Sequence, residues 1–208
     1  MEDVLEVYKR PYESSQPVVC MDEISKQLVS ETRQPLPAQP GQAQRYDYEY
    51  RREGVRNLFM FFEPLRGWRH LKVTQRRTRQ DWAWAMKELV DVYYPDAQRI
   101  TVVLDNLNTH TGASLYETFE PAEARRIWER LELHYTPKHG SWLNMAEIEL
   151  SVFARQCLNR RIPDEHTLRQ EVAALEAERN RSSSAVNWRF TTADARIKLK
   201  KLYPVIEP

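Results

Sequence analysis

The alternation of apolar and polar positions along the chain predicts five strands. Five short runs are rich in apolar, β-branched or aromatic residues and end at turn-forming residues, a pattern typical of buried strands. Pro64 to Gly67 separate the second run from the third and predict a hairpin between them. The first and fourth runs each end in an acid, Asp22 and Asp105. The five runs are residues 18–22, 57–63, 68–74, 100–105 and 131–135.

Between and after these runs, apolar positions recur with the period of a helix. A segment that begins near Thr78 shows this spacing until Pro95 interrupts it. Residues 34–44 hold three prolines and one glycine, so we expect an exposed loop there. The other expected helices are residues 113–130, 142–160 and 164–179.

The order of these elements indicates an α/β fold. The steps from strand through helix to strand require parallel neighbours, with helices covering the sheet. Three antiparallel strands followed by two parallel ones is the arrangement of the ribonuclease H-like fold. By this analogy we expect a mixed five-stranded sheet with helices on both faces.

Composition narrows the class of protein. With 208 residues, 41% of them hydrophobic, and six tryptophans, the chain is long enough for one sizeable core and too apolar for disorder. No apolar run approaches the roughly 18 residues of a membrane span, and the first residues do not resemble a signal peptide. Cys20 and Cys157 lie far apart in apolar runs, which favours a reducing compartment. We therefore expect a cytoplasmic protein that does not contact a membrane.

The net charge of +1 conceals a segregation of charge along the chain. Residues 45–79 carry ten bases and four acids, and residues 188–201 carry five bases and one acid. Residues 80–123, by contrast, carry eight acids and two bases. Basic segments of this kind bind polyanions such as nucleic acid, although they are also common as solvated faces.

The two acids that end strands are candidates for a metal site. Acids at the same end of neighbouring parallel strands converge, and a carboxylate on a following helix, Glu147 or Glu149, can reach them. Taken singly, each acid has a structural explanation, such as an Asx turn or a capping box. Together, carboxylates repel one another unless divalent cations neutralise them. Two cations about 3.5–4 Å apart suit phosphoryl transfer on DNA.

Other chemistries lack their motifs. The chain holds no phosphate-binding G-x-x-x-x-G-K-[ST], no dinucleotide-binding G-x-G-x-x-G and no zinc-binding H-E-x-x-H.

The choice between Glu147 and Glu149 as the third acid stays open at this point, because the apolar stripe of their helix leaves them on opposite flanks at similar angles. His110 and His139 lie close in the chain to the proposed acids and are candidates for contacting a scissile phosphate.

Four blocks of sequence carry a resemblance to a known family. Together they resemble the catalytic half of bacterial transposases of the insertion sequence 630 family, within the mariner superfamily, over about residues 15–204. The resemblance implies a DDE transposase, whose ribonuclease H-like core cuts DNA at the element ends and joins the freed 3′-hydroxyls to target DNA. The blocks are CMDE at 20–23, VLDNLNTH at 103–110, TPKHGSWLNMAE at 136–147 and WRFTTADAR at 188–196.

The resemblance assigns the site residues. By position, Asp22, Asp105 and Glu147 match the three catalytic, metal-binding acids, with 41 residues between the last two. They are expected to hold two Mg²⁺ or Mn²⁺ ions. The chain departs from the family in having Met145-Ala146 where many members have proline two residues before the glutamate. It also has only about seventeen residues before its first strand, where family members usually carry helix-turn-helix domains.

These observations define the expected organisation and partners. We expect an N-terminal extension at 1–17, the catalytic domain at 18–181 and a basic tail at 182–208. The expected partner is DNA, both at the element ends and at the target. The active form is expected to be a homodimer. If this chain is a fragment or a split-frame product, we expect a separate helix-turn-helix chain to recognise the element ends. The alternatives are a ribonuclease H-like nuclease that does not join strands, and an inactive remnant that only binds DNA. The expected DNA-binding residues are Arg76, Arg77, His110, Lys138, His139, Lys200 and Lys201.

Overall fold

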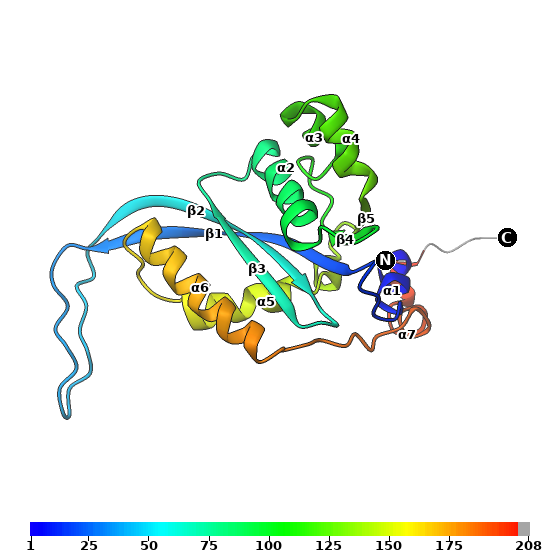
Figure 1. Ribbon diagram of the computed structural model, residues 1–208. Coiled ribbons are helices and arrows are strands. Elements are labelled where there is room, and N and C mark those ends of the chain that lie inside the picture. The colour runs from blue at the N-terminus through cyan, green and yellow to red at the C-terminus, as the bar shows by residue number, and fades with distance from the viewer. Residues whose placement is uncertain (204–208) are drawn as a thin grey trace.

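The computed structural model describes residues 1–203, which fold around one sheet of five strands (Figure 1). The strands are β1 (Val18–Glu31), β2 (Tyr50–Glu63), β3 (Trp68–Thr74), β4 (Ile100–Leu104) and β5 (Leu131–Tyr135). Their order in the sheet is β3-β2-β1-β4-β5. The pairs β1–β2 and β2–β3 are antiparallel, whereas β1–β4 and β4–β5 are parallel. The predicted mixed sheet of ribonuclease H-like arrangement is thus confirmed.

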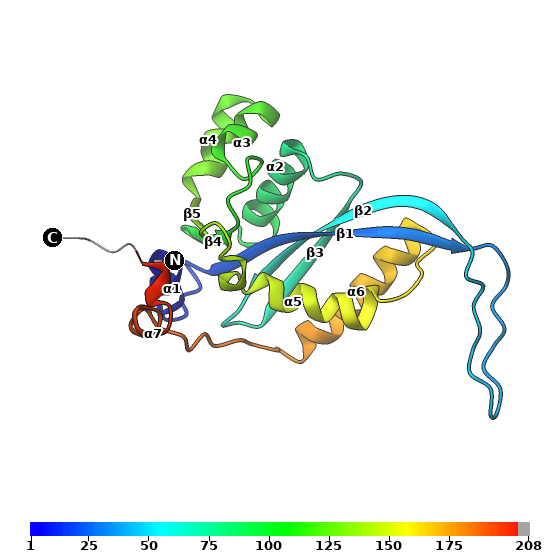
Figure 2. The ribbon, with the colours of Figure 1, turned by 180° about the vertical axis from the view of Figure 1, so that it is seen from behind.

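Helices cover both faces of the sheet (Figures 1 and 2). One face carries α2 (Arg79–Glu88), α3 (Gly112–Thr118) and α4 (Pro121–Glu129), and the other carries α5 (Ala146–Phe153) and α6 (Glu165–Arg181). α2 starts after Thr78, near which the sequence predicts the helix to begin, and Thr78 and Asp81 form a capping box there. None of the helices within residues 1–203 combines the length and the apolar character that crossing a bilayer needs.

The covered sheet separates two hydrophobic cores, and this separation sets the direction of the side chains near the start of β1. Cys20 belongs to the core under α5 and α6, whereas Val19 and Met21 belong to the core under α2. Successive side chains of a strand point to opposite faces. Asp22 therefore lies on the face of α5, and Glu23 lies on the face of α2.

Two of the predicted helices are interrupted. Residues 113–130 form two helices, because the backbone is extended at Phe119 and Pro121 begins α4. The predicted helix at 142–160 opens instead with a 3₁₀ turn at Ser141–Leu143, and α5 starts only after it. Helical periodicity detects the buried stripe but not these breaks.

The N-terminal residues form a helix that the sequence did not predict, since its seven residues are too few to show a period. This helix, α1 (Glu2–Tyr8), buries its apolar side chains and packs against α7 (Thr192–Lys198). Arg196 of α7 donates two hydrogen bonds of 2.8 Å to the carboxylate of Glu2. The expected basic tail therefore contains a docked helix, and its residues 204–208 lie outside the described residues.

β1 and β2 are both longer than predicted. They continue as a two-stranded ribbon away from the other strands, and residues 32–49 project from the end of this ribbon as a long loop (Figure 1). The expected exposed loop at 34–44 forms most of this projection. Isolated bridges pair Leu36 with Arg45 and Gln39 with Gln42 within it.

Candidate active site

The three acids proposed as a metal site come from three elements. Asp22 lies on β1, Asp105 directly follows β4, and Glu147 lies in the first turn of α5. In the parallel pair of β1 and β4, Cys20 lies opposite Val103. Asp22 and Asp105 each lie two residues beyond this pair, so they are level with each other where β4 ends.

The acids influence one another electrostatically. Burial raises the pKa of Asp22 from its ordinary value to about 7. This value of the Asp22 pKa includes a smaller upward contribution from the negative charges of Asp105, Glu23 and Glu147, and a 2.8 Å hydrogen bond from the backbone N–H of Glu23 to Oδ1 of Asp22 that lowers it. The carboxyl group of Asp22 is therefore the one on which the charges of the other three acids act.

Asn144 ties the start of α5 to the strand that carries Asp22. Its buried amide donates from Nδ2 to the carbonyl oxygen of Met21 at 2.8 Å, and its Oδ1 accepts from the backbone N–H of Ala146 at 3.1 Å. Since Met21 immediately precedes Asp22, this one side chain sets the distance between β1 and the first turn of α5. Asn144 lies in the sequence block at 136–147, but the sequence does not indicate this role.

Glu149, the alternative to Glu147, is engaged elsewhere. Its carboxylate is buried and accepts hydrogen bonds of 2.6 and 2.8 Å from Arg179 of α6. Arg69 of β3, fully buried as well, lies 3.1 Å from the same carboxylate. Glu149 thus links α5 to α6 and β3, whereas Glu147 is partly exposed and acts on Asp22.

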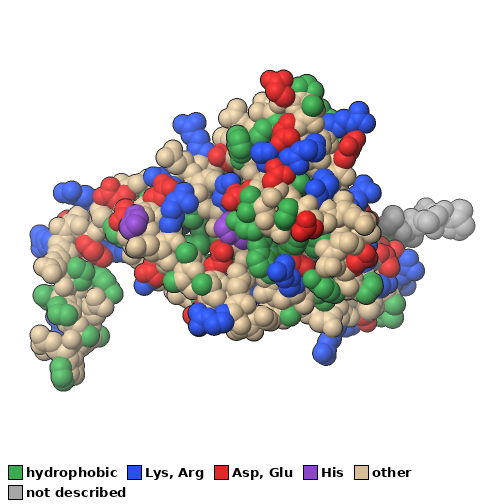
Figure 3. Space-filling model, viewed as in Figure 1, with side chains coloured by type: hydrophobic (Ala, Val, Ile, Leu, Met, Phe, Trp, Pro, Cys, Tyr) green, Lys and Arg blue, Asp and Glu red, His purple; other side chains and the backbone are tan. Residues whose placement is uncertain are grey.

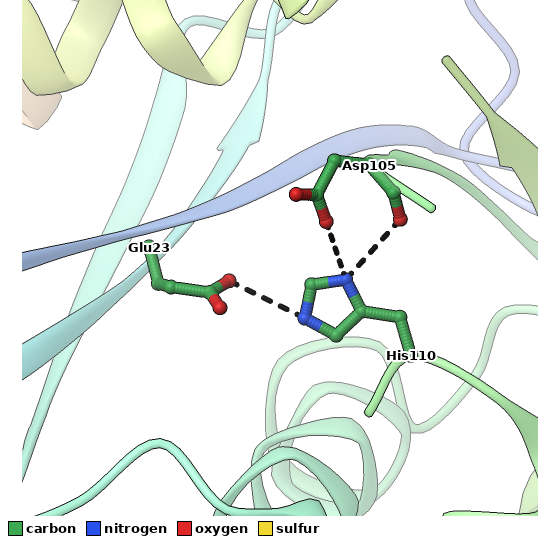
Figure 4. A group of neighbouring side chains, drawn as sticks. All are labelled: Glu23, Asp105 and His110. Carbon is green, nitrogen blue, oxygen red and sulfur yellow. Dashed lines mark hydrogen bonds and ion pairs between the residues drawn. The ribbon is translucent and has the colours of Figure 1, made fainter. Parts of the chain in front are cut away.

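His110 lies inside the molecule and not on its surface. Its ring is fully buried between Glu23 and Asp105, with Nε2 3.3 Å from Oε2 of Glu23 and Nδ1 2.7 Å from Oδ1 of Asp105 (Figure 4). Burial alone lowers the pKa of His110, but its contacts with the two carboxylates outweigh burial and raise it to about 9. The sequence analysis proposed His110 as a DNA contact, and the structure instead gives the ring two acids as neighbours. Glu23 was not singled out, although it adjoins Asp22 in the chain.

An open cleft of about 430 Å³ adjoins Asp105. Lys138 and His139, two of the expected DNA-binding residues, line it from the loop after β5. His139 has a positive φ of 63°, and a Cβ on Gly140 would lie 2.6 Å from a ring carbon of Pro137. The glycine is therefore required for the tight turn that presents these side chains beside Asp105.

The other expected DNA-binding residues lie outside this cleft. Arg76 and Arg77 are exposed in the loop between β3 and α2, and Lys200 and Lys201 are exposed in a short 3₁₀ turn after α7. Neither pair lines the cleft beside Asp105.

The acidic segment at 80–123 does not form an acidic surface. Acidic and basic side chains intermingle over the helices at the top of Figure 3. Arg126 pairs with both Asp91 and Glu123, and Lys87 pairs with the same two acids. The charge segregation seen along the sequence is therefore neutralised locally by side chains that the fold brings together.

The cluster fits a divalent cation chemically. The negative charges of Asp105, Glu23 and Glu147 all raise the pKa of the Asp22 carboxyl group, so these acids lie close enough to repel one another. Carboxylate oxygens crowded in this way repel one another, and hard cations such as Mg²⁺ prefer such ligands. Asp22, Asp105 and Glu147 are the residues that would hold the cation.

The sequence matches one protein family. Residues 17–169 match the pattern of the DDE superfamily endonucleases, which is most of the chain and includes all three acids. No curated protein is significantly similar to the chain in sequence.

Solved structures share the fold. The crystal structure of the Mos1 strand transfer complex matches with a TM-score of 0.57 and 15% sequence identity, over 87% of this chain and 54% of that chain. A pre-cleavage Mos1 transpososome matches with a TM-score of 0.41 and 13% identity, over 87% of this chain and 58% of that one. The chain spans a little over half the length of the proteins in these structures. The first match supports the ribonuclease H-like architecture.

Proposed function

Because the chain belongs to the DDE superfamily of endonucleases, we propose that it is the catalytic part of a DNA transposase of the insertion sequence 630 family. The observation that carries this proposal is the meeting of three acids from separate elements. Asp22 and Asp105 are level in the parallel pair of β1 and β4, and the charge of Glu147 acts on the same carboxyl group of Asp22.

In this proposal, Asp22, Asp105 and Glu147 together hold two Mg²⁺ or Mn²⁺ ions. When bound, such ions activate the attacking oxygen and stabilise the leaving oxygen of a phosphodiester. Asn144 keeps the first turn of α5 against β1, so that the carboxylate of Glu147 stays within reach of Asp22. The engagement of Glu149 by two arginines supports Glu147 as the third acid.

The basic residues bind the DNA backbone. Lys138 and His139 line the cleft beside Asp105 and are placed to contact the phosphate next to the cut. Arg76, Arg77, Lys200 and Lys201 are exposed and would hold more distant phosphates. Contacts of this kind position a duplex without reading its sequence. Recognition of element ends would then need a helix-turn-helix segment, and pairing of two ends would need a dimer.

The test is cleavage and strand transfer by the full chain on a duplex that carries terminal inverted repeats. We expect Mn²⁺-dependent cleavage, with joined products on a target plasmid, and loss of both with Asp105→Asn. Asp96→Asn, a matched change at an exposed acid, should retain both. Cleavage without joining would favour the nuclease alternative. DNA binding without any metal binding would favour the inactive remnant.

A further inference from the structure

We propose that Glu23 and His110 form a positioning pair that fixes the carboxylate of Asp105 for cation binding. Neither residue is itself a metal ligand in this proposal. The inference rests on the proposed function, because it requires that Asp105 holds a cation.

The imidazole ring contacts Asp105 at two points. Nδ1 of His110 lies 2.7 Å from Oδ1 of Asp105 and 3.2 Å from its backbone oxygen (Figure 4). A ring that contacts both the backbone and the carboxylate of one residue restricts the rotation of its side chain. Oδ1 is thereby occupied by the ring, and Oδ2 remains for the cation.

The imidazole ring of His110 is held more firmly than the carboxylate of Asp105. It stacks on Trp82 with centroids 5.8 Å apart, and the carbonyl oxygen of His110 accepts a 2.7 Å hydrogen bond from the hydroxyl of Tyr135. The backbone N–H of His110 donates to the carbonyl oxygen of Leu107 at 3.0 Å. Asp105, by contrast, lies at the end of β4 in an irregular loop, with about a third of its side chain exposed. His110 is therefore the fixed member, and Asp105 is the member that is positioned.

Glu23 completes the pair from the far side of the ring. Its carboxylate approaches Nε2 at 3.3 Å and comes from β1, on the face opposite to Asp22. A carboxylate at one nitrogen of an imidazole ring fixes the orientation in which the other nitrogen is presented. Glu23 thus orients the ring that orients Asp105, in the way that outer carboxylates orient the histidines of metal sites.

An alternative explanation is that Glu23, Asp105 and His110 themselves bind a cation. One possible ligand atom from each of Glu23, Asp105 and His110 lies within 4.8 Å of the others. However, the two acids approach opposite nitrogens of the ring, and each makes its own ion-pair contact there, at 2.7 Å for Asp105 and 3.3 Å for Glu23. The geometry favours a chain of contacts from Glu23 through His110 to Asp105 over a shared ion.

Two amide substitutions separate the two edges of the ring. Asparagine places its amide nitrogen near the position of Nδ1, whereas the longer glutamine reaches the position of Nε2. His110→Asn should therefore retain the contact with Asp105, and His110→Gln should lose it. We expect Mn²⁺ affinity of the full chain, measured by electron paramagnetic resonance titration, to fall about 10–100-fold in His110→Gln and His110→Ala. His110→Asn should recover most of that loss.

Glu23→Gln should weaken Mn²⁺ binding several-fold and leave the number of bound ions unchanged. His166→Gln, a matched change at an exposed histidine, should alter neither quantity. Melting temperatures of all variants are measured alongside, because a purely structural role would lower stability in the two amide variants alike without separating their affinities.

Three results would overturn the inference. Equal Mn²⁺ affinity in His110→Asn and His110→Gln would remove the positioning role. Loss of one bound ion in Glu23→Gln would make Glu23 a ligand. If the wild-type chain bound no Mn²⁺ at all, the proposed metal site itself would fall, and the inference with it.

Discussion

The carboxyl group of Asp22, which we propose to be a metal ligand, lowers the stability of the metal-free chain as the pH rises. Its pKa of about 7 lies well above the ordinary value of an aspartate, so the folded chain keeps a proton that the unfolded chain has already released. Folding without metal therefore takes up a proton between about pH 4 and pH 7. The free energy of unfolding falls as the pH rises through that window and is lowest above it.

Replacing the carboxyl group of Asp22 by an amide removes this loss in the free energy of unfolding. Asp22→Asn should abolish cleavage and, with metal removed by a chelator, should stabilise the chain at pH 8 by on the order of 1–3 kcal/mol. The difference should shrink as the pH falls and should approach zero only below about pH 3, where Asp22 is protonated in both the folded and the unfolded state. Calorimetric melting at pH 4, 6 and 8 measures this. Identical melting of Asp22→Asn and wild type at pH 8 would contradict it.

The two glutamates of α5 provide a matched pair of changes. Glu147→Gln should abolish cleavage with little change in melting temperature, because Glu147 is partly exposed. Glu149→Gln should leave Arg69 buried without its charge partner and cost about 3–5 kcal/mol, yet retain cleavage per folded molecule. Thermal melting and single-turnover cleavage of both variants test the assignment. The opposite pattern would make Glu149 the third acid.

At the residue scale, the sequence predicts Asp22 and Asp105 because each ends an apolar run. It does not separate Glu147 from Glu149 by periodicity. The deciding partners, Arg69 and Arg179, lie far away in the chain, on β3 and α6. The contacts of His110 with Glu23 and Asp105 were likewise not predictable, since Glu23 comes from another strand.

At the scale of elements, apolar runs predict the existence and order of the strands better than their lengths. The run at 18–22 becomes a strand that continues to Glu31, because residues 23–31 pair through the backbone with a largely polar part of β2. Hydropathy does not report such pairing. The true start of α5 was also missed, since it depends on a buried amide and not on the apolar stripe.

The side-chain amide of Asn144 leads to a prediction about α5. Asn144→Leu, of similar size, removes both the donor to the carbonyl oxygen of Met21 and the acceptor for the backbone N–H of Ala146. We expect a loss of about 1–3 kcal/mol in stability, as for a buried group without its partner. Because the first turn of α5 is then released from β1, cleavage should fall at least about tenfold. Urea unfolding and cleavage assays measure the two effects, and unchanged cleavage would contradict the positioning of Glu147 by Asn144.

At the scale of the whole molecule, the order of elements was sufficient to predict the mixed sheet. The pairing of α1 with α7 was not predictable, because it joins residues at opposite ends of the chain. The charge pattern was also misleading over residues 80–123, where Asp91 and Glu123 pair with Lys87 and Arg126. Segment counts of charge therefore describe a surface only where the residues stay exposed, as Arg76 and Arg77 do.

Those exposed bases predict how the whole molecule binds DNA. Replacing Arg76 and Arg77 together, or Lys200 and Lys201 together, by alanine should weaken binding to a terminal-repeat duplex and to a scrambled duplex alike. The slope of log affinity against log salt should flatten by up to about 1.8 for each pair, as the loss of two phosphate contacts requires. Arg125→Ala, at an exposed arginine already paired with Glu129, is the control. Fluorescence anisotropy at several salt concentrations measures this, and an effect on one duplex only would indicate base reading.

The pairing of α1 with α7 also bears on how the chain folds as it is synthesised. α1 is synthesised before the sheet, whereas α7, which binds it through Arg196 and Glu2, is synthesised after the sheet. Contacts so distant in sequence form slowly. We therefore expect the docking of α7 on α1 to follow the formation of the sheet.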